Sequence, residues 1–166
     1  MTTKEREELS HAEQNAISWR DMITSSHEAW RFCAAEFHHL SQQARNLSDE
    51  AQQVLKGHGF DGSNHQEVAE AIEENMQAAP LQVAVRCSQW HDPSSSWDLS
   101  PDEFQILLST GGPALRVTGD LENGRPVDAR LEHQDWGTPW THQRSTHEFQ
   151  VDALSWFAGL FWFGEG

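Results

Sequence analysis

The stretch Ala114–Gln134, ALRVTGDLENGRPVDARLEHQ, decides the fold class of this chain. Asparagine and glycine both tolerate a positive φ angle, so the pair Asn123-Gly124 is a strong signal for a tight β-hairpin. We therefore predict two antiparallel strands, Ala114 to Asp120 and Val127 to Gln134, joined by this turn.

Two further strands are predicted before the hairpin. Apolar residues at positions 81, 83, 85 and 87 alternate with mostly polar ones, which is the period of a strand with one solvated face. Phe104 to Ser109 is predicted to form the next strand, and Gly111-Gly112-Pro113 the turn that follows it. Together these segments predict a four-stranded antiparallel meander, which ends at Gly137-Thr138-Pro139.

The residues before Pro80 follow the period of helices instead. Apolar residues recur every three or four positions from Leu9 to Ile23 and again from Trp30 to Leu47, so each stretch has one apolar face. Thr24-Ser25-Ser26 lies between the two stretches and predicts a break with a new N-cap. We therefore expect two separate helices in this region.

Two shorter helices are predicted next. Ser48 is expected to cap a third helix, which Gly57-His58-Gly59 ends because glycine accepts the left-handed conformation. Ser63 and Gln66 have the spacing of a capping box and predict the start of a fourth helix. The buried stripe of this fourth helix is predicted to consist of Val68, Ile72 and Met76.

The last segment, from about Thr146, is predicted to form an apolar helix that packs on the sheet. The chain is thus expected to be an α+β protein with a single domain over residues 1–166, comprising a helical part (1–80) and a sheet plus C-terminal helix (81–166). Its final residues are very apolar for a chain end. They are expected either to dock on the sheet or to form a homodimer interface through Phe161, Trp162 and Phe163.

The charge of the chain is strongly negative. There are 26 acidic residues against 11 basic ones, which gives a formal net charge of -15, and the excess is spread over both halves. A field of this sign repels nucleic acid and anionic membranes and attracts basic protein surfaces. Acidity that serves only solubility is the alternative explanation.

Other features of the composition suggest a cytoplasmic protein. The chain has no apolar run of about 18 residues, which a membrane-spanning helix would need. The N-terminal MTTKEREE is polar and does not resemble a signal peptide. Cys33 and Cys87 lie in apolar contexts and are expected to stay reduced rather than to form a disulfide.

The segment from Asp135 to Trp140, DWGTPW, is the most unusual part of the sequence. Tryptophan in a surface loop is a frequent interface anchor, although both rings could instead fold back over the sheet. Trp90 and Trp97 raise the same question in an earlier loop. The predicted partner-binding residues are Trp90, Trp97, Asp120, Glu122, Asp135, Trp136 and Trp140.

Ten histidines raise the question of a metal site. His133 and Asp135 are two residues apart on one strand face, and His142 and His147 follow, so three ligands could hold zinc with an open position. No His-Glu-x-x-His or Cys-x-x-Cys spacing occurs, so exposed or hydrogen-bonding histidines are the favoured interpretation. We predict no metal, no cofactor and no catalytic residue, with a His/Asp-based metal-dependent enzyme as an alternative.

The stretches Leu107–Leu121 and Ala129–Trp140 together resemble a block in small acidic proteins of phages and other mobile elements. The resemblance carries no catalytic residue. It implies a protein that meets bacterial defence systems, as anti-CRISPR and antirestriction proteins do. The expected function is inhibition of a nucleic-acid-binding defence protein in the host cell, with nucleic-acid mimicry as one mode. A small-ligand or protein-binding module built on the tryptophan loops is the other interpretation.

Overall fold

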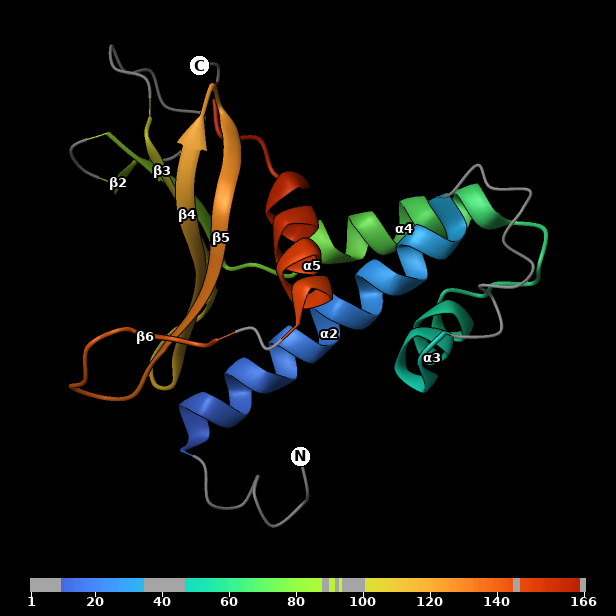
Figure 1. The fold of residues 1–166 in the computed structure, drawn as a ribbon, viewed down its shortest axis with the longest axis horizontal. Helices are drawn as coiled ribbons and strands as arrows, with labels where there is room; N and C mark the ends of the chain where they lie inside the picture. Colours follow the sequence, from blue (N-terminus) through green and yellow to red (C-terminus); the bar gives the residue numbers. More distant parts are fainter. Residues whose placement is uncertain are drawn as a thin grey trace.

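The computed structural model describes residues 10–34, 47–87, 90–91, 93, 101–144 and 147–164, and it confirms the predicted α+β class. Helices precede the sheet and a further helix follows it (Figure 1). The elements, in chain order, are α2 (His11–Ala34), α3 (Asp49–Gly57), α4 (His65–Ala78), β1 (Gln82–Arg86), β2 (Trp90–His91), β3 (Glu103–Ser109), β4 (Ala114–Glu122), β5 (Arg125–Gln134), β6 (Thr141–His142) and α5 (Glu148–Gly159).

The sheet has the strand order β2-β1-β3-β4-β5-β6, and every neighbouring pair is antiparallel. Its four long strands are the predicted meander. The predicted count of four is wrong, because β2 and β6 add a two-residue strand at each edge. Two residues are too few to show an alternating pattern, so the sequence carries no periodic signal for either strand.

The hairpin forms where Asn123-Gly124 predicts it. Asn123 has φ 52° and Gly124 has φ 73°, and Glu122 pairs with Arg125 directly across the turn. Positive φ at both central residues gives the turn the twist of the flanking strands. The strands therefore continue up to the turn, two residues beyond their predicted ends on each side.

Helix α2 corrects one prediction, because it runs through Thr24-Ser25-Ser26 without a break. The Thr24 hydroxyl donates to the carbonyl of Arg20 (2.7 Å), and the Ser25 hydroxyl donates to that of Met22 (3.1 Å). These bonds satisfy the hydroxyl groups inside the helix, so they do not cap a new one. Most of the predicted second apolar stripe, from Trp30 to Leu47, lies outside the described residues, because these do not include positions 35–46.

The caps of the two shorter helices give mixed results. The Ser48 hydroxyl accepts from the Ala51 backbone N–H at 3.1 Å, as predicted for an N-cap. At α4 the predicted capping box is wrong: Asn64 is the N-cap residue, and the Ser63 hydroxyl donates to Asp61 Oδ1 (2.8 Å) instead. The predicted stripe on α4 is confirmed, since Val68, Ile72 and Met76 are all buried.

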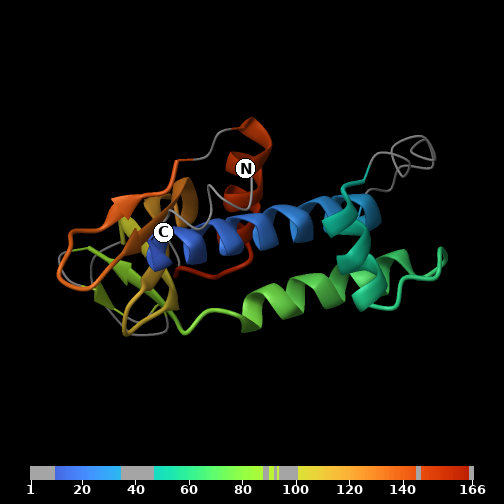
Figure 2. The same ribbon diagram turned by 90° about the horizontal axis from the view of Figure 1, so that it is seen from below.

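The helices lie on one side of the sheet and leave the other side open (Figures 1 and 2). Helix α5 packs against both β5 and α2. Helix α2 contacts β4 and β5, and then continues beyond the sheet to α3 and α4 (Figure 2). The core between the layers is formed by buried side chains of every layer, including Ile23, Ile72, Phe104, Ile106, Leu115, Val117, Leu131 and Phe157.

The apolar chain end docks on this core. Phe163 is fully buried with its ring 4.8 Å from that of Phe104, and Phe161 packs edge-on against Phe157 at 5.3 Å. Trp162, between them, is 61% exposed. Within the described ranges, no helix combines the length and apolar character needed to cross a bilayer.

Candidate partner-binding surface

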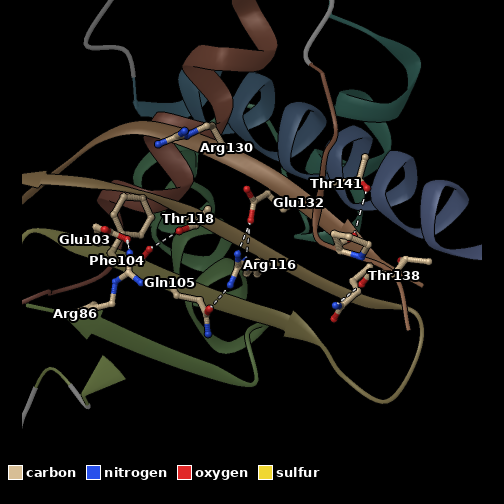
Figure 3. Close-up of polar contacts among 12 residues, drawn as sticks. Arg86, Glu103, Phe104, Gln105, Arg116, Thr118, Arg130, Glu132, Thr138 and Thr141 are labelled. Atoms are coloured by element: carbon tan, nitrogen blue, oxygen red, sulfur yellow. Dashed lines mark hydrogen bonds and ion pairs between the residues drawn. The ribbon is translucent and has the colours of Figure 1, made fainter. Parts of the chain in front are cut away.

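The open face of the sheet carries a polar layer. Burial alternates along β3 and β4, so every second side chain points away from the helices. Gln105, Arg116, Thr118 and Glu132 lie together in the middle of this outer face (Figure 3). All four are half-buried, although they lie on the uncovered side of the sheet.

Arg116 is the centre of this layer. Its Nε and Nη2 both reach Glu132 Oε2 at 2.8 Å, and its Nη1 donates to Gln105 Oε1 at 2.9 Å (Figure 3). Its guanidinium carbon also lies 4.2 Å from the centre of the Trp140 ring. Contacts of a guanidinium with a carboxylate and with an aromatic face both stabilise it. Arg116 therefore acts as a structural cross-link, and Trp140 folds back onto the sheet.

Two further ion pairs lie on the outer face. Arg86 bonds to Glu103, and Arg130 lies 3.9 Å from Asp120, with both side chains about half exposed. An exposed pair at that distance contributes little to stability. Asp120, predicted to bind a partner, thus lies beside Arg130, while the exposed Glu122 faces Arg125 in the hairpin.

Charge is divided unequally between the two layers. Strands β1, β3, β4 and β5 contain four arginines and five carboxylates, so the sheet is nearly balanced. Helices α2 to α5 contain eleven carboxylates and three basic residues, and α4 has four glutamates and no basic residue. Among the described elements, the negative charge is therefore concentrated on the helices.

Trp136 is the most exposed large apolar residue of the described part of the chain, at 81%. The turn that presents it is closed by Thr138, whose backbone N–H and hydroxyl both donate to the carbonyl of Asp135, at 3.1 and 3.0 Å. The side-chain amide of Gln134 donates to the Thr138 carbonyl at 2.6 Å. Asp135 thus takes part in these hydrogen bonds only through its backbone carbonyl, which accepts them.

Gly112, in the turn between β3 and β4, lies against the Trp136 ring. A Cβ atom at Gly112 would overlap Nε1, Cδ1 and Cε2 of Trp136, all of them atoms of the five-membered ring. This edge of the indole therefore lies directly against the glycine backbone, and most of the side chain remains exposed. Two turns that are 24 residues apart in sequence thus meet at one exposed tryptophan.

The predicted partner-binding residues fall into separate groups. Trp136 and Trp140 lie near the end of the sheet where Ala114 pairs with Gln134, and Asp120 and Glu122 lie toward the hairpin. Eight residues of β4 separate the two ends, about 27 Å at the usual rise of a strand. Trp90 contributes backbone pairing to Arg86, but its side chain and the whole of Trp97 lie outside the described residues.

The histidines predicted as alternative metal ligands do not converge. His133 pairs with Thr141, whereas His142 pairs with Glu132, so the two histidines point to opposite faces of the sheet. His147 is exposed at the start of α5. No three His, Cys, Asp or Glu side chains in the described ranges are placed to hold a metal ion. The alternative of a His/Asp metal centre is therefore not supported by these residues.

Gly112 and Arg116, which contact the two tryptophans, were not among the residues predicted as functional. Comparisons of the chain with protein-family models, with curated proteins and with solved structures found no match. The role of the surface is therefore argued from its geometry: an exposed indole rests against the turn between β3 and β4, beside a sheet face that carries several ion pairs.

Proposed function

We propose that this chain is a non-catalytic protein-binding module whose anchor is Trp136. The observation that carries the proposal is that this indole is 81% exposed while one edge of it rests against Gly112. Burial of a large exposed ring by a partner contributes strongly to affinity, and tryptophan is among the commonest anchors of protein interfaces. Arg116 already occupies one face of Trp140, which favours Trp136 over Trp140 as the contact residue.

The partner that fits this surface has an apolar pocket for the indole and a basic region that faces the acidic helices. The net charge of -15 would accelerate association with such a protein. A nucleic-acid-binding defence protein of bacteria has this chemistry. We therefore propose inhibition of such a protein, in the manner of anti-CRISPR or antirestriction proteins, with the exposed glutamates of α4 as the region that would stand in for phosphates.

Capture of partners from a bacterial lysate tests the anchor. The bait is the full chain, compared with Trp136→Ser and with the matched control Trp162→Ser, which also removes an exposed tryptophan. We expect a retained protein that is lost with Trp136→Ser, kept with Trp162→Ser, and released by salt. Equal retention by all three baits would overturn the proposal.

The mode of inhibition needs a separate test with the retained protein after purification. If α4 mimics nucleic acid, duplex DNA or RNA should displace the chain, and changing Glu67, Glu70 and Glu74 together to Gln should weaken binding and lower its salt dependence. If nucleic acid and the chain bind the partner simultaneously, mimicry is excluded, and the binding role of Trp136 still stands.

A further inference from the structure

A buried histidine lies at the junction of α2 and α5. His27 is only 5% exposed. Its ring stacks on Trp156 and Phe149 of α5, with ring centres 5.2 and 5.5 Å apart, and on Trp30 of its own helix at 6.1 Å. Trp30 and Trp156 also contact each other at 5.5 Å. His27 is therefore central to the aromatic contact between the two helices.

Polar groups in this cluster are incompletely satisfied. Within the described residues, His27 Nδ1 and Trp156 Nε1 are buried without a hydrogen-bond partner. Trp30 Nε1, by contrast, donates to Glu73 Oε1 of α4 at 2.6 Å. A neutral imidazole needs one donor and one acceptor contact, whereas a protonated one carries two donors that both require acceptors. The closed junction therefore disfavours protonation of His27.

The charges around His27 come from three helices. Burial is the largest cause that lowers the pKa of His27, from 6.5 to about 4, and the nearby Arg31 of α2 lowers it further. Asp152 of α5 acts in the opposite direction. On α4, Glu73 already accepts the hydrogen bond of Trp30. Below neutral pH, a state with an exposed His27 therefore binds a proton that the closed state does not.

We infer that the α2–α5 junction is an acid-operated latch, in which protonation of His27 releases α5 from α2. Linkage gives the direction of the pH effect: the free-energy difference that favours the closed state is largest above the pKa of an exposed histidine, and it decreases as the pH falls. Acidification from pH 7 to pH 5 shifts the equilibrium about 20-fold toward the open state.

Hydrogen exchange of the full chain at pH 7 and pH 5, corrected for intrinsic rates, tests the latch. If α5 opens without global unfolding, its amides should be less protected than those of β4 at both pH values, and their protection should fall about 20-fold between pH 7 and pH 5. His27→Phe keeps an aromatic ring and removes the titrating group, so its α5 should not respond to pH.

A second variant covers the case in which His27→Phe fails to fold. Asp152→Asn removes an exposed carboxylate that favours protonation of His27 in the closed state. The loss of α5 protection should therefore begin at the same pH as in the native chain and continue to a lower pH. A loss that ends at the same pH in Asp152→Asn as in the native chain would overturn the latch. So would an equal pH response in His27→Phe, or equal protection of α5 and β4 amides at each pH, since only global unfolding would then expose His27.

Discussion

Arg116 and Trp140 form a stacked pair on the outer face of the sheet, with the guanidinium carbon 4.2 Å from the centre of the indole ring. The same guanidinium is held by Glu132. This relationship separates the two tryptophans of one short loop: Trp140 belongs to the sheet, and Trp136 remains available to a partner.

Removal of Arg116 should destabilise the protein more than loss of an exposed ion pair would. Arg116→Ala leaves the partly buried Glu132 carboxylate without its partner, which should cost about 2–3 kcal/mol in the free energy of unfolding. The double variant with Glu132→Ala should recover part of that loss, and urea unfolding of all four proteins measures the coupling. Strictly additive losses would mean that the two side chains do not interact.

Gly112→Ala should displace Trp136. Both Gly111 and Gly112 have φ near 100°, so alanine at either position should cost about 1–3 kcal/mol in backbone strain. Only at Gly112 would the added Cβ overlap the indole, since nothing lies within 4 Å of a Cβ at Gly111. Partner capture should therefore fail with Gly112→Ala and persist with Gly111→Ala. If both variants captured the partner equally well, or both failed to capture it, binding would not depend on the position of Trp136.

Gly119→Ala should be among the most destabilising substitutions in the sheet. Its Cβ would lie 2.5 Å from the Val127 carbonyl oxygen and 2.8 Å from Phe104 Cε1, and the backbone of a neighbouring strand cannot move aside cheaply. We expect a loss of about 2–3 kcal/mol by urea unfolding. Gly159→Ala is the control: it lies in α5 with open space around it, and it should stabilise the protein by up to about 1 kcal/mol.

Global stability should fall on acidification through His27. The pKa of this side chain is lowered from 6.5 to about 4 by burial, so the unfolded chain takes up a proton between these values that the folded chain does not. Stability is therefore complete above pH 6.5 and falls toward pH 4, by about 3 kcal/mol in total. Urea unfolding measured across this pH range should show that the free energy of unfolding changes less with pH in His27→Phe than in the native chain.

The two cysteines should differ in reactivity. Both are free thiols, but Cys33 is buried, and burial raises its pKa to about 11. Cys33 is therefore a neutral thiol at pH 8 and a poor nucleophile. Iodoacetamide under native conditions should label the half-buried Cys87 first, as peptide mass spectrometry can show. Equal labelling rates would indicate that α2 opens readily around Cys33.

The sequence predicts the hairpin and the long strands, because their signals are local. It could not predict the Arg116–Glu132 pair. Counted outward from the Asn123-Gly124 turn, Arg116 would face Leu131; the register shift between Thr118 and Asp120 places Glu132 opposite it instead. At the shift, Asp128 has φ 51°, and the carbonyl oxygens of Val127 and Asp128 lie against Gly119. These are contacts of the packed sheet, which local sequence signals do not predict.

Other differences have similar causes. The hydroxyl groups of Thr24 and Ser25 can either cap a helix or bond within one, and only packing on both sides of them selects the continuous α2. Nothing in the sequence around Trp136 and Trp140 distinguishes the two side chains. Their different environments depend on contacts from elsewhere in the chain: Arg116 of β4 lies on Trp140, and Gly112 lies against Trp136.

The unbroken α2 has a mechanical consequence. Its 24 residues form a rod about 36 Å long, held by the sheet at one end and carrying α3 and α4 at the other. A tilt of about 5° where the rod meets the sheet would swing its far end by about 3 Å, since a helix of this rise bends little along its length. A small change of angle beneath β4 and β5 would thus become a larger displacement of the acidic helices.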